Sequence, residues 1–535
     1  MEEKTNLNNY TAEDIESAIL NAVDNNGVLY DQWHLSHLKP LQFYYEANSF
    51  APVWSDTALF LSHSKHFMRY LDTCISDGLL KNEYHYSDLN QLVETLSTDS
   101  IKMKDAVLWA KTDILFTDAF MHVIADLKQG RLVDDSLLYK NLPDRWPTFF
   151  QQQLTKYVAP NRPDTFFRSL QPKWNGYGLL KDKIADFYKR MDTASFTYVH
   201  FPFEKENTED SLEFISSLTE RLNQDATLKL ALPEQPDSAT LSEAIIKYQK
   251  RHGLEPDGKV GKQVIQRLNL TDKVKLKRLF ITLDRYKLMP DSIPDVYIWV
   301  NIPSFNLQAW QGDSIAVTSR VVCGKPVTPT PIISSEVYDM VTYPTWTVPA
   351  SIIKKEMLPG LKKSSGYLSR KGLDLYNNKG EKVDPHSVDW SKYKKGIPYQ
   401  IKQGSGDNNA LGVIKFNFRN PHDVYLHDTN QRNFFKNSNR ALSHGCVRVQ
   451  EWLPLAQYLI RNDSLALALN GDSLNYTPDS VSNWIEAKKK QRIPLKKRVP
   501  IFINYFSCAA IDDQLVFYTD IYEEDKKLME KYFSN

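Results

Sequence analysis

The chain has 535 residues, of which 42% are hydrophobic, 24% charged and 12% aromatic, a composition typical of folded proteins and unlike that of disordered or fibrous chains. Its 66 Lys and Arg residues balance its 65 Asp and Glu residues, so we expect no chain-wide basic surface and no nucleic-acid partner. The length exceeds what one hydrophobic core supports and indicates three or more domains.

No apolar run approaches the roughly 18–20 residues of a membrane span, so we expect no membrane span in this chain. The opening residues MEEKTNLNNY lack the basic and apolar regions of a secretory signal. Taken literally, this start predicts a cytoplasmic protein, but it is equally consistent with removal of an export signal or lipid anchor. Four well-separated cysteines without a CxxC pair predict neither a disulfide framework nor a four-cysteine zinc site; they are Cys74, Cys323, Cys446 and Cys508.

Residues 1–235 are predicted to form a mostly helical scaffold region. Thr11 is a candidate N-cap for the helix TAEDIESAILNAV, and Ser55 is a candidate N-cap for a second helix that ends near Gly78. The segment 105–130 is apolar on more than one face, so we expect a helix inside a bundle.

Residues 236–275 are predicted to form a small helical module. Within LSEAIIKYQKRHGLEPDGKVGKQVIQRLNL, apolar residues at helical spacing precede and follow the turn Pro256-Asp257-Gly258. The stretch YQKRHGLEPDGKVGKQVIQRL resembles the signature of a peptidoglycan-binding module. The alternative is a helical hairpin that serves only as a spacer. Residues 276–293 are expected to be a linker.

A β-rich domain is predicted for residues 294–470, because β-branched and aromatic runs with alternating polarity begin after Pro294. Between about residues 354 and 409 this pattern gives way to polar, Gly-containing sequence, which we interpret as an inserted lid rather than core. Strands resume at ALGVIKFNF.

The tail, residues 471–535, is expected to pack on the β-rich domain. It offers a helix with Thr477 as N-cap and Pro478 in its first turn, followed by a hairpin turning at Asp512-Asp513. The basic run KKKQRIPLKKR, residues 488–498, is interpreted as a solvated helix end and connector, the alternative being a surface for an acidic polymer or a membrane.

The run ALSHGCVRV carries the chemistry-bearing residues. A cysteine attacks as its thiolate and therefore needs a nearby base. His444 lies two residues before Cys446 and cannot easily reach it in line, so His427, in the strand-like run HDVYLHDTN, is the better candidate base. Gly445 permits unusual dihedrals that let backbone N–H groups converge on an oxyanion. Arg448 could bind a substrate carboxylate or hold the turn.

Two readings without a catalytic cysteine compete with this hypothesis. His422, His427, His444 and Cys446 could supply four zinc ligands, but their spacing fits no standard pattern, and we expect no metal. In the second alternative, Cys446 is simply a small buried thiol packed beside structural histidines. That interpretation does not explain why so many polar groups are concentrated in the turn.

At these residues the chain resembles the L,D-transpeptidases of the YkuD type, in which a histidine, a spacer and Ser/Thr-His-Gly-Cys, a hydrophobic residue and Asn or Arg form the signature. Here His427 is followed by fifteen residues and then Ser443-His444-Gly445-Cys446-Val447-Arg448. Blocks such as VNIPSFNLQAW and YPTWTVPASI resemble the YcbB-like subgroup, and this likeness covers roughly residues 295–525. Cys323 departs from that subgroup's pattern and is expected to pack in a strand.

The resemblance implies a multidomain α+β periplasmic enzyme with a helical scaffold, the peptidoglycan-binding module and a β-rich catalytic domain carrying a capping insertion. It would join peptidoglycan stem peptides through a thioester on Cys446, taking a tetrapeptide donor, releasing D-Ala and passing the acyl group to an amine acceptor. It also implies acylation by carbapenems and requires no cofactor.

Within this mechanism His427 is the base, and His444, Gly445 and Cys446 form the turn. The carbonyl or the side chain of Asp428 would orient His427. Ser443 is expected to hydrogen-bond within the turn rather than to attack, and it joins three further candidate substrate-binding residues, Arg448, Tyr343 and Trp346. A core role for Tyr343 and Trp346 is equally plausible from the sequence.

Two alternatives remain for the function of the whole chain. One is an L,D-carboxypeptidase or cross-link hydrolase of the same fold, and the other is a catalytically silent wall-binding scaffold.

Overall fold

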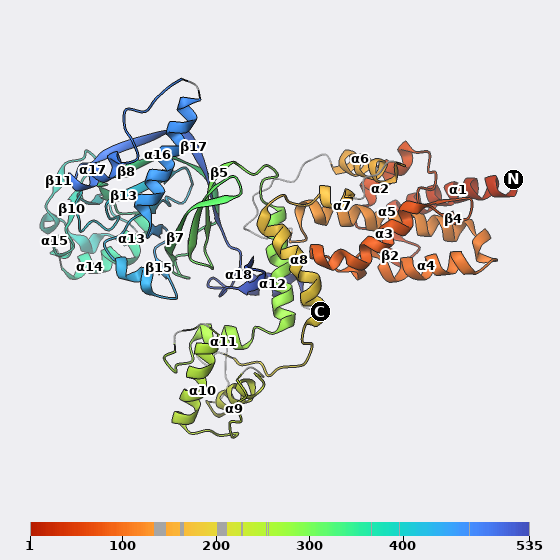
Figure 1. The fold of residues 1–535 in the computed structure, drawn as a ribbon, viewed down its shortest axis with the longest axis horizontal. Helices are drawn as coiled ribbons and strands as arrows, with labels where there is room; N and C mark the ends of the chain where they lie inside the picture. Colours follow the sequence, from red (N-terminus) through yellow and green to blue (C-terminus); the bar gives the residue numbers. More distant parts are fainter. Residues whose placement is uncertain are drawn as a thin grey trace.

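The computed structural model describes residues 2–132, 146–160, 165–200, 211–225, 228–252, 254, 256–364, 366–394, 396–469 and 471–533. Figure 1 shows a helical N-terminal region on the right, a β-rich part on the left and a small helical module below, with α8 and α12 between them. The chain is therefore a multidomain α+β protein with a helical scaffold, a small helical module and a β-rich C-terminal part, as the sequence predicts.

The N-terminal region is a helical bundle around α5 (Ala106–Gln129). Asp105 caps this helix by accepting a hydrogen bond of 3.2 Å from the Leu108 N–H, and Gly130, at φ +77°, ends it. Most of α5 is buried, which confirms the prediction of a helix inside a bundle. The surrounding helices are α1 (Glu2–Asp24), α2 (Leu38–Ala47), α3 (Ser62–Thr73), α4 (Tyr86–Thr98), α6 (Trp146–Val158) and α7 (Phe166–Ser169).

Both helix starts predicted in this region are wrong. Helix α1 begins at Glu2, so Thr11 lies inside it and donates to the Leu7 carbonyl at 2.8 Å. Ser55 belongs to the small hairpin of β3 (Ser55–Asp56) and β4 (Leu59–Phe60), and the next helix starts only at Ser62. Ser and Thr bond the backbone in turns and mid-helix as well as at caps, so their presence alone did not locate the helix starts. Gly78 does end a helical segment, at φ +76°.

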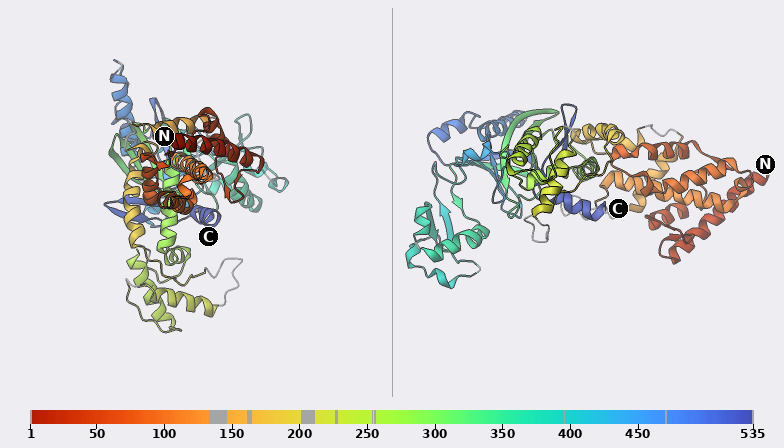
Figure 2. Two further views of the ribbon diagram at one scale, coloured as in Figure 1. Left: turned by 90° about the vertical axis from the view of Figure 1, so that its right-hand side faces the viewer. Right: turned by 90° about the horizontal axis from the view of Figure 1, so that it is seen from below.

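Two long helices, α8 (Asn175–Arg190) and α12 (Asp272–Lys287), pack against each other and join the parts of the molecule. The right-hand view of Figure 2, from below, shows these yellow and green helices between the N-terminal bundle and the β-rich part. Residues 276–293, expected to be a linker, contain most of α12, which is largely buried. An aromatic cluster fastens these helices to the β-rich part, with Trp174 lying 5.5 Å from the ring centroids of Tyr297 and Phe502.

The module consists of α9 (Ser211–Asn223), α10 (Ser238–Arg251) and α11 (Lys262–Leu268). Gln249 explains the glutamine of the sequence signature, because its amide bonds the turn that follows the helix: Nε2 donates to Asp257 Oδ1 at 2.8 Å and Oε1 accepts from the Gly258 N–H at 2.9 Å. Gly258 has φ +72°, and a Cβ there would lie 2.6 Å from Ser242 Oγ. The predicted inward faces are buried; they comprise Ala244, Ile245, Tyr248, Gln249, Val264, Ile265 and Leu268.

The β-rich part is built on one sheet with the strand order β15-β7-β16-β14-β13-β8-β17-β5-β6, in which β7 also pairs with β6. That extra pairing closes the sheet on itself and gives it a barrel-like form. Its strands are β5 (Val296–Asn301), β6 (Asn306–Gln311), β7 (Ser314–Gly324), β8 (Ile333–Thr342), β13 (Ile414–Phe418), β14 (Leu426–His427), β15 (Ala441–Ser443), β16 (Val447–Val449) and β17 (Gln491–Asn504). Cys323 is fully buried in β7, as expected. Helix α16 (Trp452–Ala468) packs on β17 and β7.

A subdomain is inserted between β8 and β13. It has a four-stranded sheet with the order β11-β10-β12-β9 and its own apolar core, which includes the buried residues Leu361, Leu368, Leu375 and Ile401. The predicted insertion is therefore a subdomain with a core of its own, which forms because widely spaced apolar residues meet once the segment folds. Its elements are β9 (Trp346–Thr347), α13 (Ala350–Ile352), the π-helical turn η4 (Ile353–Met357), α14 (Leu358–Lys363), α15 (Tyr367–Arg370), β10 (Leu373–Tyr376), β11 (Lys382–Val383) and β12 (Gln400–Gln403).

The tail packs on the β-rich part. The predicted hairpin is confirmed: β18 (Cys508–Ile511) pairs with β19 (Gln514–Phe517) around Asp512 and Asp513, both at positive φ. Helix α17 (Ser480–Glu486) starts after the predicted Thr477 cap. The basic run 488–498 lies mostly in β17 rather than in a connector. Helix α18 (Glu524–Tyr532) ends the described chain. Within the described residues, no helix combines the length and apolar character needed to cross a membrane.

Candidate active site

Parallel pairing of β14 with β16 builds the candidate site. Leu426 pairs with Val447 and His427 with Arg448. Leu426 and Val447 are fully buried in the core of the sheet. Because side chains alternate along a strand, the residues on either side of this pair share the opposite face: Tyr425, His427, Cys446 and Arg448. Strand pairing therefore brings the predicted thiol and the predicted base onto one surface.

His427 is buried, with 5% of its surface exposed. Its Nδ1 forms a short hydrogen bond to the backbone carbonyl of Asp428, so Nδ1 carries the proton and Nε2 is the nitrogen that can accept one. Burial, together with the nearby Arg448 charge, lowers the pKa of His427 to about 3. The imidazole is therefore neutral at neutral pH, which is the form that can accept a proton.

Asp428 orients His427 through its carbonyl and not through its side chain. The Asp428 carboxylate instead accepts hydrogen bonds from the Val413 N–H at 3.1 Å and from Arg432 Nη2 at 2.9 Å. Gly412, at φ +63°, lies directly against this carboxylate, and a Cβ there would be 2.3 Å from Asp428 Oδ2. Glycine is therefore required for the carboxylate to reach its backbone donor.

The Cys446 thiol is half-buried and lies 3.8 Å from the Asp423 carbonyl oxygen. Burial raises the pKa of Cys446, while a hydrogen bond from Tyr425 and the charges of Lys415 and Arg448 act in the opposite direction. The balance leaves the thiol protonated at neutral pH. In the free protein this face thus carries a neutral thiol and a neutral imidazole.

The turn before the thiol is closed by Ser443. Its Oγ donates to the Cys446 carbonyl at 2.7 Å and accepts from the Gly445 N–H at 3.3 Å, so Ser443 hydrogen-bonds within the turn. Gly445 has φ +114°, a conformation that side-chain-bearing residues rarely adopt. Among the described residues, the Cys446 N–H has no hydrogen-bond acceptor. This donor is available for an oxyanion on a substrate carbonyl.

The loop after β7 supports this turn from below. Thr330 Oγ1 donates to the Gly445 carbonyl at 2.8 Å and accepts from the Gly324 N–H at 2.8 Å. Tyr522, in the tail, donates to the Gly324 carbonyl at 2.7 Å and accepts from the Thr330 N–H at 3.1 Å. Sequence reasoning assigned no role to Thr330 or Tyr522, because they lie more than a hundred and more than seventy residues from Cys446 in the chain.

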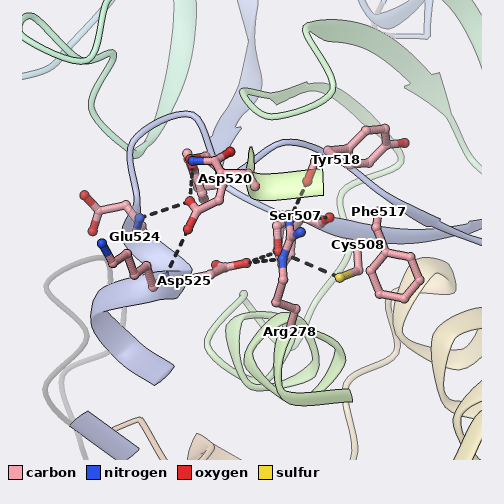
Figure 3. Close-up of polar contacts among 12 residues, drawn as sticks. Arg278, Ser507, Cys508, Phe517, Tyr518, Asp520, Glu524 and Asp525 are labelled. Atoms are coloured by element: carbon pink, nitrogen blue, oxygen red, sulfur yellow. Dashed lines mark hydrogen bonds and ion pairs between the residues drawn. The ribbon is translucent and has the colours of Figure 1, made fainter. Parts of the chain in front are cut away.

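A buried polar network fixes the tail that carries Tyr522 (Figure 3). Asp525 accepts hydrogen bonds from Arg278 Nε at 3.0 Å, from Arg285 Nη1 at 2.6 Å and from Ser507. Burial alone would raise the pKa of Asp525, but Arg285 and Arg278 lower it below its ordinary value. Both arginines belong to α12, so the network connects the helix between the domains with the segment that supports the turn.

Two further residues on the thiol face were missed from the sequence, Lys415 and Tyr425. Lys415 pairs with His427 across β13 and β14, and its Nζ lies 3.8 Å from the centre of the Tyr425 ring. Little in the sequence singles out Lys415, because Lys415 and Asn417 take the polar positions of an ordinary apolar–polar alternation in IKFNF. Its ammonium lies on the face where a thiolate would form.

The candidate substrate-binding residues take different positions. Arg448 Nη1 donates to Gln431 Oε1 at 2.9 Å, and its buried Nε has no partner in the described chain. Trp346 is half-buried and hydrogen-bonds the Tyr425 hydroxyl, so it borders the thiol face. Tyr343 is buried, and its hydroxyl donates to Asp407 Oδ1 at 2.7 Å at the base of the insertion.

His444 points away from the thiol and toward the insertion. Its Nε2 forms a short hydrogen-bonding contact with the carboxylate of Glu356 in η4, so the turn that carries Cys446 touches the inserted subdomain directly. In the described residues no group of three or more His, Cys, Asp and Glu side chains is arranged to hold a metal ion.

Comparison with known proteins agrees with this geometry. Residues 295–464 match the family model described as "L,D-transpeptidase catalytic domain". The chain carries a YkuD-type L,D-transpeptidase domain. Residues 39–184 match a "Scaffold domain", and residues 220–268 match the model described as "Putative peptidoglycan binding domain". The module is therefore a peptidoglycan-binding domain by family, as its signature predicted.

A relative from Haemophilus influenzae, described as "Putative L,D-transpeptidase", is 31% identical over 252 residues, which are 47% of this chain and 49% of the relative. The chain thus spans about half the length of this relative. A solved structure titled "Structure of the Ldtfm-avibactam carbamoyl enzyme" aligns at 14% identity and a TM-score of 0.17, covering 40% of this chain and 52% of that one; a similarity this low carries no argument about the L,D-transpeptidase domain. The YcbB-like subgroup remains a prediction.

Proposed function

We propose that this protein is a peptidoglycan L,D-transpeptidase that joins stem peptides through a thioester on Cys446. The observation that carries the proposal is the shared face of β14 and β16, where a thiol and a neutral imidazole with a fixed tautomer lie beside a free backbone donor. The family match of the domain to L,D-transpeptidases supports the same reaction class.

In the first half-reaction the thiol of Cys446 attacks the carbonyl carbon of the third stem residue. His427 Nε2 takes the thiol proton as the C–S bond forms, and the negative charge on the carbonyl oxygen is held by the Cys446 N–H. The C–N bond to the fourth residue then breaks, and His427 returns the proton to the departing amine. The products are D-Ala and a thioester on Cys446.

In the second half-reaction the amine of an acceptor stem attacks the thioester carbonyl. His427 accepts a proton from this amine, the C–S bond breaks, and the thiol is restored with a new amide cross-link. Water in place of the amine would give an L,D-carboxypeptidase or a cross-link hydrolase. The inserted subdomain, whose Glu356 contacts His444 beside the thiol, would limit access of water to the thioester.

The surrounding charges suit this reaction. Lys415 and Arg448 oppose the effect of burial on the Cys446 thiol, so they stabilise negative charge that develops on sulfur. Arg448 has an unpartnered Nε and would bind a donor carboxylate.

Trp346 would line the donor groove. A carbapenem carbonyl would occupy the place of the donor carbonyl and acylate Cys446. The proposal sets the protein in the periplasm, where its substrate is found.

The test is product analysis by mass spectrometry after incubation with a disaccharide-tetrapeptide. We expect cross-linked dimers from the unmodified protein and none from Cys446→Ala, whereas Cys74→Ala, whose thiol is buried in the helical region, serves as the matched control and retains the reaction. Tripeptide without dimers would establish the hydrolase instead. If the protein formed no product and Cys446 formed no adduct with a carbapenem, the result would favour the catalytically silent wall-binding scaffold.

A further inference from the structure

A cavity lies between the peptidoglycan-binding module and the tail of the catalytic domain. It has a volume of about 390 Å³, within the range of roughly 300–1,000 Å³ typical of sites for small ligands. Its lining comes from the module and α12 on one side, residues 198–200, 252, 254 and 262–278, and from Pro303 and the tail, residues 517–529, on the other. Figure 1 shows α11 at the end of the module that faces the rest of the molecule. The cavity is distinct from the thiol face, because no residue of β14 or β16 lines it.

Few direct contacts span this cavity. Arg267 Nη1 donates to the Phe517 carbonyl at 3.3 Å, Gln266 Nε2 donates to the Asp520 carbonyl at 3.3 Å, and Lys262 Nζ lies 3.4 Å from Glu523 Oε1. All three are long for hydrogen bonds of their type. Helix α11 and the tail segment 517–523 therefore face each other without packing tightly, which leaves room for a ligand between them.

Arg267 is a half-buried charge with no carboxylate partner among the described residues. Burial lowers the pKa of Arg267, and the neighbouring Arg278 charge acts in the same direction. The carboxylates nearby already have partners. Asp525 binds Arg278 and Arg285, and Asp520 accepts hydrogen bonds from the Tyr505 hydroxyl and the Glu524 N–H (Figure 3). Glu523 lies 3.4 Å from Lys262. A desolvated guanidinium without a counter-charge is unfavourable, and an anion from outside the chain would relieve it.

A second polar group in the cavity also lacks a partner. Gln266 Oε1 is buried and receives no hydrogen bond in the described chain. It lies one residue from Arg267 on α11 and lines the same cavity. An unsatisfied acceptor beside an unpaired guanidinium matches a ligand that presents a carboxylate next to an N–H donor, which is the arrangement at the C-terminal residue of a peptide.

We propose that this cavity is a second peptide site, which binds a peptidoglycan stem peptide by its free carboxylate, with Arg267 as the ion partner and Gln266 as the acceptor for the adjacent amide N–H. This inference rests on the proposed function for the identity of the ligand. A stem held here tethers its polymer to the catalytic domain, so a neighbouring stem reaches Cys446 at a raised effective concentration. The module would then bind substrate jointly with the tail, not by itself.

The experiment measures binding of a disaccharide-tetrapeptide to the full chain with Cys446 alkylated by iodoacetamide. Alkylation obstructs the catalytic site, and the other three cysteines are buried. Calorimetry gives the affinity, and hydrogen exchange with mass spectrometry locates the site. We expect protection at residues 262–270 and 517–520, and about tenfold weaker binding for Arg267→Gln, equivalent to about 1.4 kcal/mol. Arg251→Gln, an exposed arginine at the end of α10, is the matched control and should bind like the unmodified chain.

Arg267→Lys covers the case in which the glutamine variant misfolds, because it keeps the charge and should bind with intermediate affinity. A tetrapeptide amidated at its terminal carboxylate should bind the unmodified chain as weakly as the free acid binds Arg267→Gln. Equal affinity of acid and amide, equal affinity of Arg267→Gln and Arg251→Gln, or no binding at all would overturn the proposal.

Turnover of the soluble donor by unalkylated protein separates this proposal from the proposed function. Binding at the cavity without any turnover would reject the transpeptidase and retain the site. Turnover with no effect of Arg267→Gln on binding would reject the site alone.

Discussion

Thr330 Oγ1 donates a hydrogen bond of 2.8 Å to the carbonyl oxygen of Gly445, in a buried position one residue before Cys446, the proposed nucleophile. The carbonyl of Gly445 and the N–H of Cys446 belong to one planar peptide unit, so they point in opposite directions. Holding the carbonyl therefore aims the N–H that would receive the oxyanion. The catalytic turn is thus oriented by a residue from the loop after β7, and Tyr522 in turn holds that loop.

Replacing Thr330 by valine should lower kcat by about tenfold, which corresponds to about 1.4 kcal/mol of transition-state stabilisation. Donor affinity should change little, since the lost bond orients a donor that acts on the developing oxyanion. Steady-state release of D-Ala measures both parameters. Thr330→Ser restores the hydroxyl and should recover most of kcat, and Thr318→Val, at an exposed position of β7, is the control. A rise in KM with kcat unchanged would contradict the assigned role.

The pH dependence of kcat/KM should be flat from about pH 5 to pH 8. The pKa of His427 is lowered to about 3 by burial, so the proton-accepting form persists far into acid. The pKa of Cys446 is raised by burial, so the thiol keeps its proton well into alkali. The productive protonation state of the pair therefore dominates between these limits. Circular dichroism at each pH verifies folding, and an acid limb centred between pH 6 and 7 would show that His427 titrates like a solvated histidine.

Lys415→Met should slow alkylation of Cys446 by iodoacetamide at neutral pH by roughly three- to tenfold. The Lys415 charge lowers the pKa of the thiol, so its removal leaves less thiolate at a given pH. The rate should rise with pH in both proteins, with the variant's curve displaced toward alkali. Lys379→Met, an exposed lysine in the inserted subdomain, should match the unmodified protein. Coinciding curves for Lys415→Met and Lys379→Met would exclude the electrostatic role.

Asp525→Asn should destabilise the catalytic domain by about 3–5 kcal/mol, because it leaves the buried guanidiniums of Arg278 and Arg285 without their counter-charge. Urea denaturation followed by tryptophan fluorescence measures the change. Asp512→Asn, in the exposed hairpin turn at φ +46°, should stay within about 0.5 kcal/mol of the unmodified protein. A similar small effect for both variants would mean that the network adds no stability.

The turn of the peptidoglycan-binding module and the hairpin of the tail could be predicted from the sequence, because both depend on residues close together in the chain. The module signature is satisfied within a few turns: Gln249 bonds Asp257 and Gly258, at most nine residues away. The hairpin at Asp512 and Asp513 is likewise set by turn chemistry alone. Helix starts at Thr11 and Ser55 were missed because short polar side chains bond the backbone equally well in other local settings.

The candidate site likewise has features that the sequence predicts and features that only the tertiary structure reveals. The sequence by itself determined which residues could carry the chemistry, since His427 and the Ser443–Cys446 turn have side chains suited to a base and a nucleophile at a recognisable spacing. Only the tertiary structure decided that the carbonyl of Asp428 and not its carboxylate orients His427. It also brought in Thr330 and Lys415, which sequence reasoning passed over. Their contribution depends on strand register and on a buried network between distant segments, and neither follows from local residue patterns.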